Sequence, residues 1–499
     1  MLLLGIDIGT SFVKVAVVDA ATQQCVATAQ CPDTESPIIT RQSGWAEQSP
    51  ELWWEHTQQA IRRVNASGKF QPRDIAAIGI SYQMHGLVVV DSQQRVLRDS
   101  IIWCDSRAID IGEKALEIIG RDVCTSRLLN APGNFTASKL AWVKTHEPEI
   151  YQKIDKIMLP GDFIAMKLTG KITTSASALS EGIFYDFRDN NLSSAIMNYF
   201  GFDRSLIPEQ RPLFSSHGGL LTAVAEQLSL RADTPVTYKA GDQPNNALSL
   251  HVLQPGEVAA TAGTSGVIYA VTDQLFNDSQ SRVNAFAHVN HSAREPRLGV
   301  LLCINGTGIM NSWMKKMCGD GLTYKDMDAL CEGIAPGSDG LVVLPFGNGA
   351  ERMLDNKTIG AQIRSIDLNK HSKNHLFRAT QEGIAFAFRY GLDIMRENHL
   401  HPTVIRAGRA NLFLSGVFLR AFVNATGVAV ELYENDGSIG AALGAGVGAG
   451  TYPSFDDAFR QLKPIQTILP DESALYEELY LSWKKALDHE LSTQPNRPS

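Results

Sequence analysis

Several features that would assign the chain to a common class are missing from its 499 residues. The seven cysteines are odd in number and scattered, and no CxxC pair occurs, which argues against a disulfide framework or a zinc site and favours a reducing compartment. The net charge is −8 and no block of five like charges occurs. We therefore expect no nucleic-acid partner, because binding to a phosphate backbone requires clustered Lys and Arg.

Long hydrophobic runs are missing as well. The longest glycine- and alanine-rich apolar run, residues 437–450, falls short of the ~20 residues that span a bilayer, and it predicts a tightly packed helix. The apolar start of the chain has no basic region before it, and Asp7 follows too soon for a signal peptide. We expect a cytoplasmic protein with no membrane partner.

The common catalytic signatures are also absent. The sequence has no HExxH, no Walker glycine–lysine loop, no GxGxxG after the first strand and no GxSxG. These absences argue against zinc protease, P-loop, Rossmann and esterase functions.

What the chain does contain is enough apolar material for more than one core. Hydrophobic residues make up 44% of it, and single cores stop growing near ~250–300 residues. A helix is predicted to start at Ser49-Pro50, since Ser can cap it and Pro fits its first position. Strands are predicted at residues 75–80 and 87–90, as a pair interrupted at residues 83–86. Helix and strand patterns alternate thereafter, which indicates an α/β architecture.

A repeated tripeptide divides the chain into two halves. Gly9-Thr10-Ser11 lies between two aliphatic arms, and Gly263-Thr264-Ser265 lies between two similar arms about half the chain later. The repetition predicts a duplicated, two-lobed protein with one hairpin per lobe and a cleft between them. Each turn is either an ordinary hairpin turn or, through glycine and successive N–H groups, a cradle for a phosphate.

Two aspartates stand at strand ends. Asp7 interrupts an apolar strand, where a carboxylate is costly without a partner; Mg²⁺ or the N–H groups of the turn would supply one. Asp242 follows a strand that ends at Gly241, which suits either a helix N-cap or a general base for phosphoryl transfer.

Two further segments leave strand-like runs. Met84-His85-Gly86 and residues 103–107, which include Trp103, carry groups that can bind or pack against a sugar, but taken by themselves these residues favour turn and salt-bridge roles.

Together these stretches resemble the FGGY carbohydrate kinases, most closely the xylulokinases, over nearly the whole chain. The individual motifs are short, but their order and spacing are jointly specific. The matching stretches are residues 5–11, 45–48, 50–54, 83–86, 103–107, 139–142, 146–149, 159–162, 241–242, 263–266, 382–383 and 436–442.

The resemblance implies a duplicated actin-like (ribonuclease H-like) fold, with two lobes and with ATP and Mg²⁺ in a central cleft. Residues 1–240 are expected to form the lobe with the sugar pocket and the first phosphate turn. Residues 241–499 are expected to form the lobe with the catalytic base, the second phosphate turn and the adenosine site.

Carried over by position, the resemblance assigns Asp7 to the metal and Asp242 as the catalytic base. The expected sugar contacts are Met84, His85, Trp103, Asp105, Arg107 and Gln243. The expected nucleotide contacts are Gly9, Thr10, Ser11, Gly263, Thr264, Ser265, Gly408 and Asn411.

Two stretches depart from the xylulokinase pattern. Xylulokinases usually carry a glycine triplet followed by Ala-Arg/Lys-Ser near the adenosine, and residues 407–413 keep only part of this motif. The departure bears on the adenine contacts and on the nucleotide that the protein prefers. Gln243 and Pro244 stand where xylulokinases commonly carry Asn and then a small residue. This departure weakens the case for D-xylulose over a related ketose or polyol.

We therefore expect an ATP-dependent sugar kinase, a monomer or homodimer, that phosphorylates a terminal hydroxyl, O5 of D-xylulose. Two other hypotheses remain open. One is an FGGY kinase for another ketose, a polyol or gluconate, and the other is a non-catalytic actin-like nucleotide switch.

Overall fold

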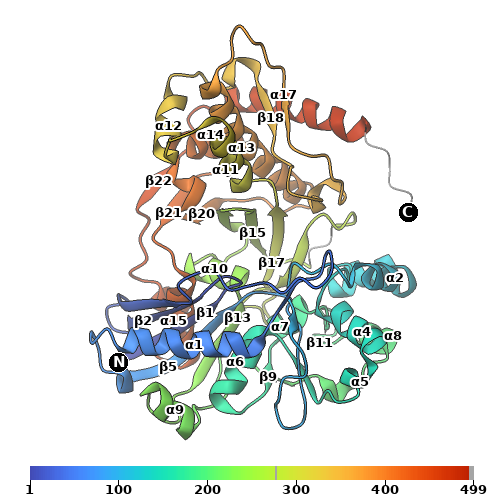
Figure 1. The fold of residues 1–499 in the computed structure, drawn as a ribbon, viewed down its shortest axis with the longest axis vertical. Helices are drawn as coiled ribbons and strands as arrows, with labels where there is room; N and C mark the ends of the chain where they lie inside the picture. The colour runs from blue at the N-terminus through green and yellow to red at the C-terminus, as the bar shows by residue number, and fades with distance from the viewer. Residues whose placement is uncertain (276–277, 494–499) are drawn as a thin grey trace.

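The computed structural model describes residues 1–275 and 278–493, and its two lobes are each built around a β-sheet (Figure 1). The first sheet has five strands in the order β3-β2-β1-β5-β13. These strands are β1 (Leu2–Ile8), β2 (Val13–Asp19), β3 (Cys25–Cys31), β5 (Ile75–Tyr82) and β13 (Val236–Gly241).

The second sheet has seven strands in the order β16-β17-β15-β14-β20-β21-β22. These strands are β14 (Glu257–Ala262), β15 (Gly266–Thr272), β16 (Asn284–Ala287), β17 (Leu298–Ile304), β20 (Val404–Gly408), β21 (Val430–Tyr433) and β22 (Gln466–Ile468). All strands of the first sheet end by residue 241, and those of the second begin at residue 257. The boundary drawn between residues 240 and 241 stays a prediction.

The two sheets repeat one pairing pattern, which confirms the predicted duplication. In the first, β3-β2 and β2-β1 pair antiparallel, and β1-β5 and β5-β13 pair parallel. In the second, β17-β15 and β15-β14 pair antiparallel, and β14-β20 and β20-β21 pair parallel. Strands β16 and β22 are additions at the edges of the second sheet.

Both predicted hairpins form. The register pairs Ile8 with Val13 and Ala262 with Gly266, so each Gly-Thr-Ser tripeptide lies in the turn between its two strands. The expected pairing of residues 75–80 with 87–90 is wrong. Both segments are strands, but β6 (Val88–Val90) pairs with β8 (Lys156–Met158), because β1 and β13 already occupy both edges of β5.

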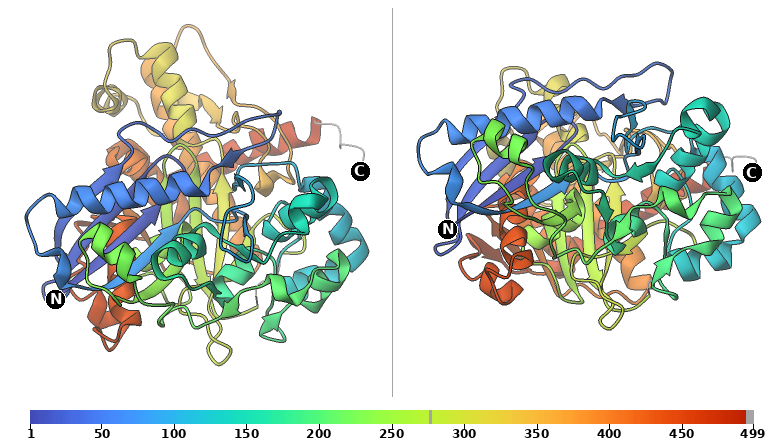
Figure 2. Two further views of the ribbon diagram at one scale, coloured as in Figure 1. Left: turned by 60° about the horizontal axis from the view of Figure 1, so that its bottom comes forward. Right: turned by 90° about the horizontal axis from the view of Figure 1, so that it is seen from below.

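The longer helices surround the sheets (Figures 1 and 2). Helix α1 begins at Pro50, and Ser49 accepts a hydrogen bond from the Leu52 N–H, as expected for an N-cap. The helices that the site uses are α1 (Pro50–Asn65), α4 (Thr136–His146), α7 (Ala176–Glu181), α10 (Asp242–Ser249), α11 (Gly308–Cys318), α12 (Tyr324–Glu332) and α15 (Gly437–Gly448). The others are α2 (Ile109–Ile119), α3 (Arg121–Val123), α5 (Pro148–Tyr151), α6 (Pro160–Thr169), α8 (Ser194–Phe200), α9 (Thr222–Leu228), α13 (Lys373–Glu397), α14 (Gly416–Thr426), α16 (Phe455–Ala458) and α17 (Ser473–Thr493).

Alternate residues of β1 bury themselves against helices on opposite faces of the first sheet. Ile6 shares a buried cluster with Trp53 of α1, whereas Leu3 shares one with Ala441 of α15. This alternation follows from the two-residue period of a strand. Helix α15 thus belongs to the second half of the sequence but packs on the first lobe (Figure 1).

Helix α15 approaches the sheet so closely that two strand positions require glycine. A Cβ placed on Gly5 would lie 1.7 Å from the Ser438 carbonyl oxygen, and one on Gly79 would lie 1.9 Å from that of Ala441. Both obstacles are backbone atoms, which cannot rotate away.

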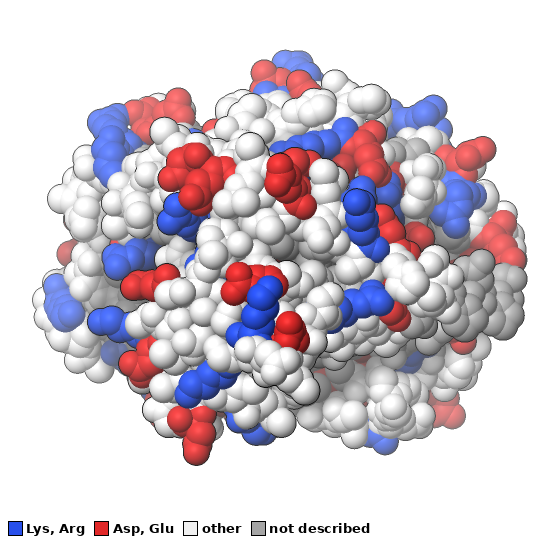
Figure 3. Space-filling view, turned by 90° about the horizontal axis from the view of Figure 1, so that it is seen from above, with Lys and Arg blue, Asp and Glu red and all other residues white. Residues whose placement is uncertain are grey.

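The surface carries both signs of charge. On the face drawn in Figure 3, Lys and Arg lie interspersed with Asp and Glu among the described residues. In the described part of the chain, every helix is too short or too polar to cross a bilayer.

We predict that Gly79→Ala destabilises the protein, because the added methyl forces α15 away from the sheet. The expected loss in the free energy of unfolding is about 1–3 kcal/mol, measured by urea denaturation. Gly333→Ala is the control, since Gly333 has a negative φ and, among the described residues, no packing neighbour lies within 4 Å of the place its methyl would take. Equal stability of the two variants would contradict close α15 packing.

Candidate active site

The first Gly-Thr-Ser turn is held by side chains of its own lobe. The Thr10 hydroxyl accepts a hydrogen bond from Trp103 Nε1 at 2.9 Å and donates to Gln83 Oε1 at 3.3 Å. The Thr10 carbonyl accepts from Gln48 Nε2 at 2.8 Å. The Gly9 N–H donates to the Phe12 carbonyl inside the turn. Sequence analysis assigned Gln48 and Gln83 no role, although both lie in matching stretches.

Asp7 is near the end of β1, next to the start of α15. A Cβ on Gly437 would lie 2.7 Å from Asp7 Oδ2, so the helix backbone faces this carboxylate directly. Burial raises the pKa of Asp7, and the negative charge of Asp436 raises it further. A second-half residue therefore contributes to the environment of a first-strand aspartate.

Asp242 is the first residue of α10, and Gly241 occupies the N-cap position. The predicted N-cap role for Asp242 is therefore wrong, because β13 runs into the helix without an intervening residue. Burial raises the pKa of Asp242 to about 7, and the charge of Asp7 contributes to the shift. A carboxyl with this pKa exchanges its proton near neutral pH, which suits a general base.

Gln243 is directly linked to this base. Its side-chain amide donates a hydrogen bond to the Asp242 carboxylate, which opposes the rise in the Asp242 pKa. Its Oε1 is buried without a hydrogen-bond partner among the described residues. The side chain thus offers an acceptor that a substrate hydroxyl can satisfy.

Met84 and His85 follow β5 and lie beside Gly241. A Cβ on Gly241 would come within 2.6 Å of Met84 Cγ, so Met84 packs against the residue before Asp242. The His85 ring packs on Phe135 and Phe286, with centroids 4.8 and 5.3 Å away.

The protonation state of His85 follows from its surroundings. Burial lowers the pKa of His85 to about 3, so the ring is neutral. Its Nδ1 lies 2.9 Å from the Glu181 carbonyl and must carry the proton to donate to it. The other ring nitrogen, Nε2, is then a hydrogen-bond acceptor.

Glu181, the last residue of α7, is a site residue that was not predicted from the sequence. Its side chain is buried beside Gly241, where a Cβ would lie 2.8 Å from Glu181 Oε2. Tyr82 hydrogen-bonds to the carboxyl, and Oε1 has no partner in the part of the chain that the structure describes. Burial raises the pKa of Glu181 well above its usual range.

A buried lysine holds the backbone of His85. His85 has a φ of +62°, a conformation that non-glycine residues adopt rarely. Lys139 Nζ of α4 donates to the His85 carbonyl at 2.9 Å and to the Ile102 carbonyl at 3.0 Å. It thereby ties the His85 turn to the segment that leads into Trp103. Burial lowers the pKa of Lys139 to about 7.

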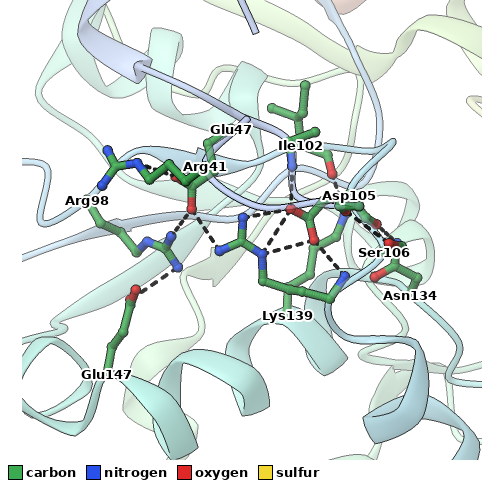
Figure 4. A network of polar contacts seen from close by, with 12 residues as sticks. Arg41, Glu47, Arg98, Ile102, Asp105, Ser106, Asn134, Lys139 and Glu147 are labelled. Carbon is green, nitrogen blue, oxygen red and sulfur yellow. Dashed lines mark hydrogen bonds and ion pairs between the residues drawn. The ribbon is translucent and has the colours of Figure 1, made fainter. Parts of the chain in front are cut away.

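Figure 4 shows the charged network around Asp105. Arg107 binds Asp105 Oδ2 at 2.7 Å and Glu47 Oε1 at 2.8 Å, and its guanidinium stacks 3.9 Å from the Trp45 ring centroid. The Arg107 side chain is only 1% exposed. Asp105 also accepts from the Ala46 N–H at 2.6 Å.

These contacts give Asp105 and Arg107 a packing role in the segment that carries Trp103. Trp103 itself is 52% exposed and reaches the first turn through its indole N–H. Direct sugar contact by these three residues stays a prediction.

The second Gly-Thr-Ser turn is bonded to the start of α11. The Gly263 carbonyl accepts from the Gly308 N–H at 2.9 Å, and the Thr264 carbonyl accepts from the Ile309 N–H at 3.0 Å. A Cβ on Gly308 would lie 2.2 Å from the Gly263 oxygen, so the contact requires glycine there.

A cavity of about 730 Å³ opens beside this turn. Gly263, Thr264 and Asn411 line it, which brings three of the predicted nucleotide contacts together. Ser265 and Gly408 are not among its described lining residues; Gly408 ends β20 and packs near Asn435.

The same cavity has an apolar rim that the sequence did not reveal. Ile309, Tyr324 and Leu414 line it and are more than a third exposed, so they offer a surface for a flat apolar group. They come from α11, α12 and a 3₁₀ turn at Asn411–Leu414, which are far apart in sequence.

We predict that Asp242→Asn is more stable than the wild type above pH 7. The folded-state pKa of about 7 exceeds the ordinary value of 3.8, so ionised Asp242 costs stability, and the cost grows as pH rises through this window. Urea unfolding at several pH values should show the variant gaining stability toward alkaline pH and matching the wild type in acid. The exposed Asp320→Asn serves as control, and a pH-independent difference for Asp242→Asn would contradict the pKa assignment.

Comparison with known proteins places this geometry in a family. Sequence models of the FGGY family of carbohydrate kinases match residues 2–249 (N-terminal domain) and 258–449 (C-terminal domain). The xylulose kinase of Bacillus subtilis is 29% identical over 92% of this chain and 90% of that protein, and that of Escherichia coli K12 is 29% identical over 94% of each. A crystal structure described as a xyloylose kinase from Brucella ovis superposes with a TM-score of 0.88 at 26% identity, covering 99% of this chain and all of that one. The chain belongs to the FGGY family of carbohydrate kinases.

Proposed function

We propose that this protein transfers the γ-phosphate of ATP to a terminal sugar hydroxyl, O5 of D-xylulose. The observation that carries the proposal is the placement of Asp242, whose pKa lies near neutral pH. It is hydrogen-bonded by Gln243, follows the glycine against which Met84 packs, and lies in the electrostatic range of Asp7. The relatives named xylulose kinase support the choice of sugar.

In the proposed reaction Asp242 accepts the proton of the attacking hydroxyl. The hydroxyl oxygen forms a bond to the γ-phosphorus, the bond from that phosphorus to the β–γ bridging oxygen breaks, and ADP leaves. His85 Nε2 and Gln243 Oε1 are acceptors for other sugar hydroxyls and orient the substrate. Trp103 offers an exposed ring for the sugar face.

The nucleotide is assigned to the cleft between the two turns. The cavity beside Gly263 and Thr264 accommodates its base and ribose, with Tyr324 and Ile309 as the apolar rim. The triphosphate then extends toward the first turn at Gly9–Ser11.

The carboxylates fit a Mg²⁺ ion that accompanies ATP. Asp7 and Asp242 are partly buried acids whose raised pKa values reflect repulsion between acids in addition to burial, so a nearby cation would relieve both. Among the described residues no group of three or more acidic, His or Cys side chains forms a closed cage. Such an open arrangement suits Mg²⁺, which usually takes one or two carboxylates with water and substrate phosphates and neutralises phosphate charge.

Gln243 favours a second candidate substrate. Its buried Oε1, unpartnered among the described residues, selects for a hydroxyl at that place, and other ketoses, polyols or gluconate provide one as well.

We further infer that the protein is a monomer or homodimer and acts in the cytoplasm. The seven free cysteines agree with a reducing compartment.

The decisive test is sugar-dependent ADP release over a panel of ketoses, polyols and gluconate. We expect D-xylulose to give the highest kcat/KM, and Asp242→Asn to lower kcat by about a hundredfold to ten-thousandfold while remaining folded. The kcat/KM of the wild type should fall as pH drops below about 7, because Asp242 becomes protonated. ATP-dependent filament assembly without sugar turnover would instead support a nucleotide switch.

We also predict that Lys139→Met raises the KM for the sugar about tenfold or more and leaves the KM for ATP unchanged. Without the ammonium, the strained His85 backbone loses its charge-assisted bond and its link to the Ile102 carbonyl, and it relaxes away from the sugar. Lys144→Met is the matched control, because Lys144 lies on the same helix and also caps two carbonyls, those of Phe200 and Gly201. A variant that only loses thermal stability, with both KM values intact, would contradict the positioning role.

A further inference from the structure

A second cavity, of about 840 Å³, lies apart from both Gly-Thr-Ser turns. Its walls come from the start of α7, the segment around residues 204–214 and the segment after β16 at residues 288–293. The described residues that line it include arginine, histidine, asparagine and serine but no aspartate or glutamate. A volume in this range is typical of small-molecule sites.

Two consecutive side chains in its wall have polar atoms that no described residue satisfies. Asn290 Nδ2 donates to the Leu253 carbonyl at 3.1 Å, whereas its Oδ1 is buried and unbonded within the described ranges. His291 Nδ1 lies 3.2 Å from the Arg297 carbonyl oxygen. His291 Nε2 is buried and has no hydrogen-bond partner among the described residues. A ligand hydroxyl both donates and accepts, so it satisfies either atom.

The cavity also has a positive rim and an apolar wall. Arg204 is exposed at its edge, and its guanidinium makes one long hydrogen bond, 3.5 Å, to Asn191 Oδ1. Arg211, by contrast, is engaged by Glu209 and by the Ser216 carbonyl. Leu213 and Phe214 supply apolar surface. Arg204 is thus the cation that an anionic ligand can reach most readily.

Two elements of this cavity wall also contact His85. Helix α7 begins in the wall at Ala176 and ends at Glu181, whose carbonyl accepts from the His85 ring. Strand β16 leads into the wall at His288 and carries Phe286, which packs on the same ring. The two elements are joined, since Ser177 Oγ donates to the Ala287 carbonyl and the Ala287 N–H donates to Ser180 Oγ.

We propose that this cavity is an effector site for a small polyhydroxylated anion, a sugar phosphate or a sugar acid. Its ligand places the anionic group at Arg204 and hydroxyls at Asn290 and His291. Occupancy shifts α7 and β16 together and so changes the affinity of the site at His85. The coupling rests on the proposed sugar-binding role of His85, whereas binding in the cavity does not.

Binding is tested by calorimetry on the full chain with D-glucose 6-phosphate, D-glucuronate and neutral D-glucose. We expect one or both anionic probes to bind, D-glucose to bind much more weakly, and Arg204→Gln to weaken the anionic probe about tenfold or more. The affinities of the two anionic probes distinguish a site that prefers phosphate from one that prefers carboxylate. Arg188→Gln, which removes an exposed arginine outside the cavity, should leave binding unchanged.

Absence of binding by both anionic probes would overturn the proposal, and so would equal binding to the wild type and to Arg204→Gln. Both outcomes are read without turnover, so they are independent of the proposed kinase activity.

Coupling is tested by measuring the KM for D-xylulose with and without the bound probe. We expect a change in this KM that disappears in Arg204→Gln. We expect Ser180→Ala to keep probe binding but to lose the change, because it breaks the bond between α7 and β16. A KM change that persists in Arg204→Gln would place the probe in the sugar site and overturn the coupling, as would a wild-type KM that does not respond.

Discussion

The backbone contact between α15 and the first sheet is the constraint on which the site depends. Gly5 and Gly79 lack side chains where the helix backbone passes, so α15 lies directly on β1 and β5. Asn245 of α10 donates to the Gly437 carbonyl at 2.9 Å and joins the start of α15 to the helix that carries Asp242. A segment from the second half of the sequence is thereby fixed against Asp7 and against the helix that carries Asp242.

That packing concentrates negative charge in a confined place. Asp7 and Asp242 are both partly buried, and Asp436 adds its charge to the environment of Asp7. Glu181 is buried close by, and burial raises its pKa well above its usual range. Burial therefore raises the pKa of all three carboxyl groups, and it brings that of Asp242 near neutral pH, where a carboxylate can act as a base.

The sugar side of the site is held by contacts from several elements rather than by its own turn. His85 has a strained backbone, and Lys139 of α4, Glu181 of α7 and Phe286 of β16 all contact it. Such redundancy is needed because a residue at positive φ is costly and persists only when its surroundings fix it. It also makes the ring sensitive to movements of α7 and β16, which lead to the second cavity.

Local pattern in the sequence determined the two hairpins, the start of α1 at Pro50, and the helix that follows Gly241, because each depends on neighbouring residues. Local pattern also singled out Asp7, Asp242, Met84 and His85 at strand ends, and the resemblance to a family assigned their roles. The pairing of β6 was wrong because strand partners depend on which edges are already occupied. Lys139 lies in a matching stretch and Glu181 and Tyr324 do not, but the local sequence gives none of the three a role in the site. Only tertiary structure brings them to the site, since a buried ammonium or carboxyl acquires its partner and its pKa from residues distant in the chain.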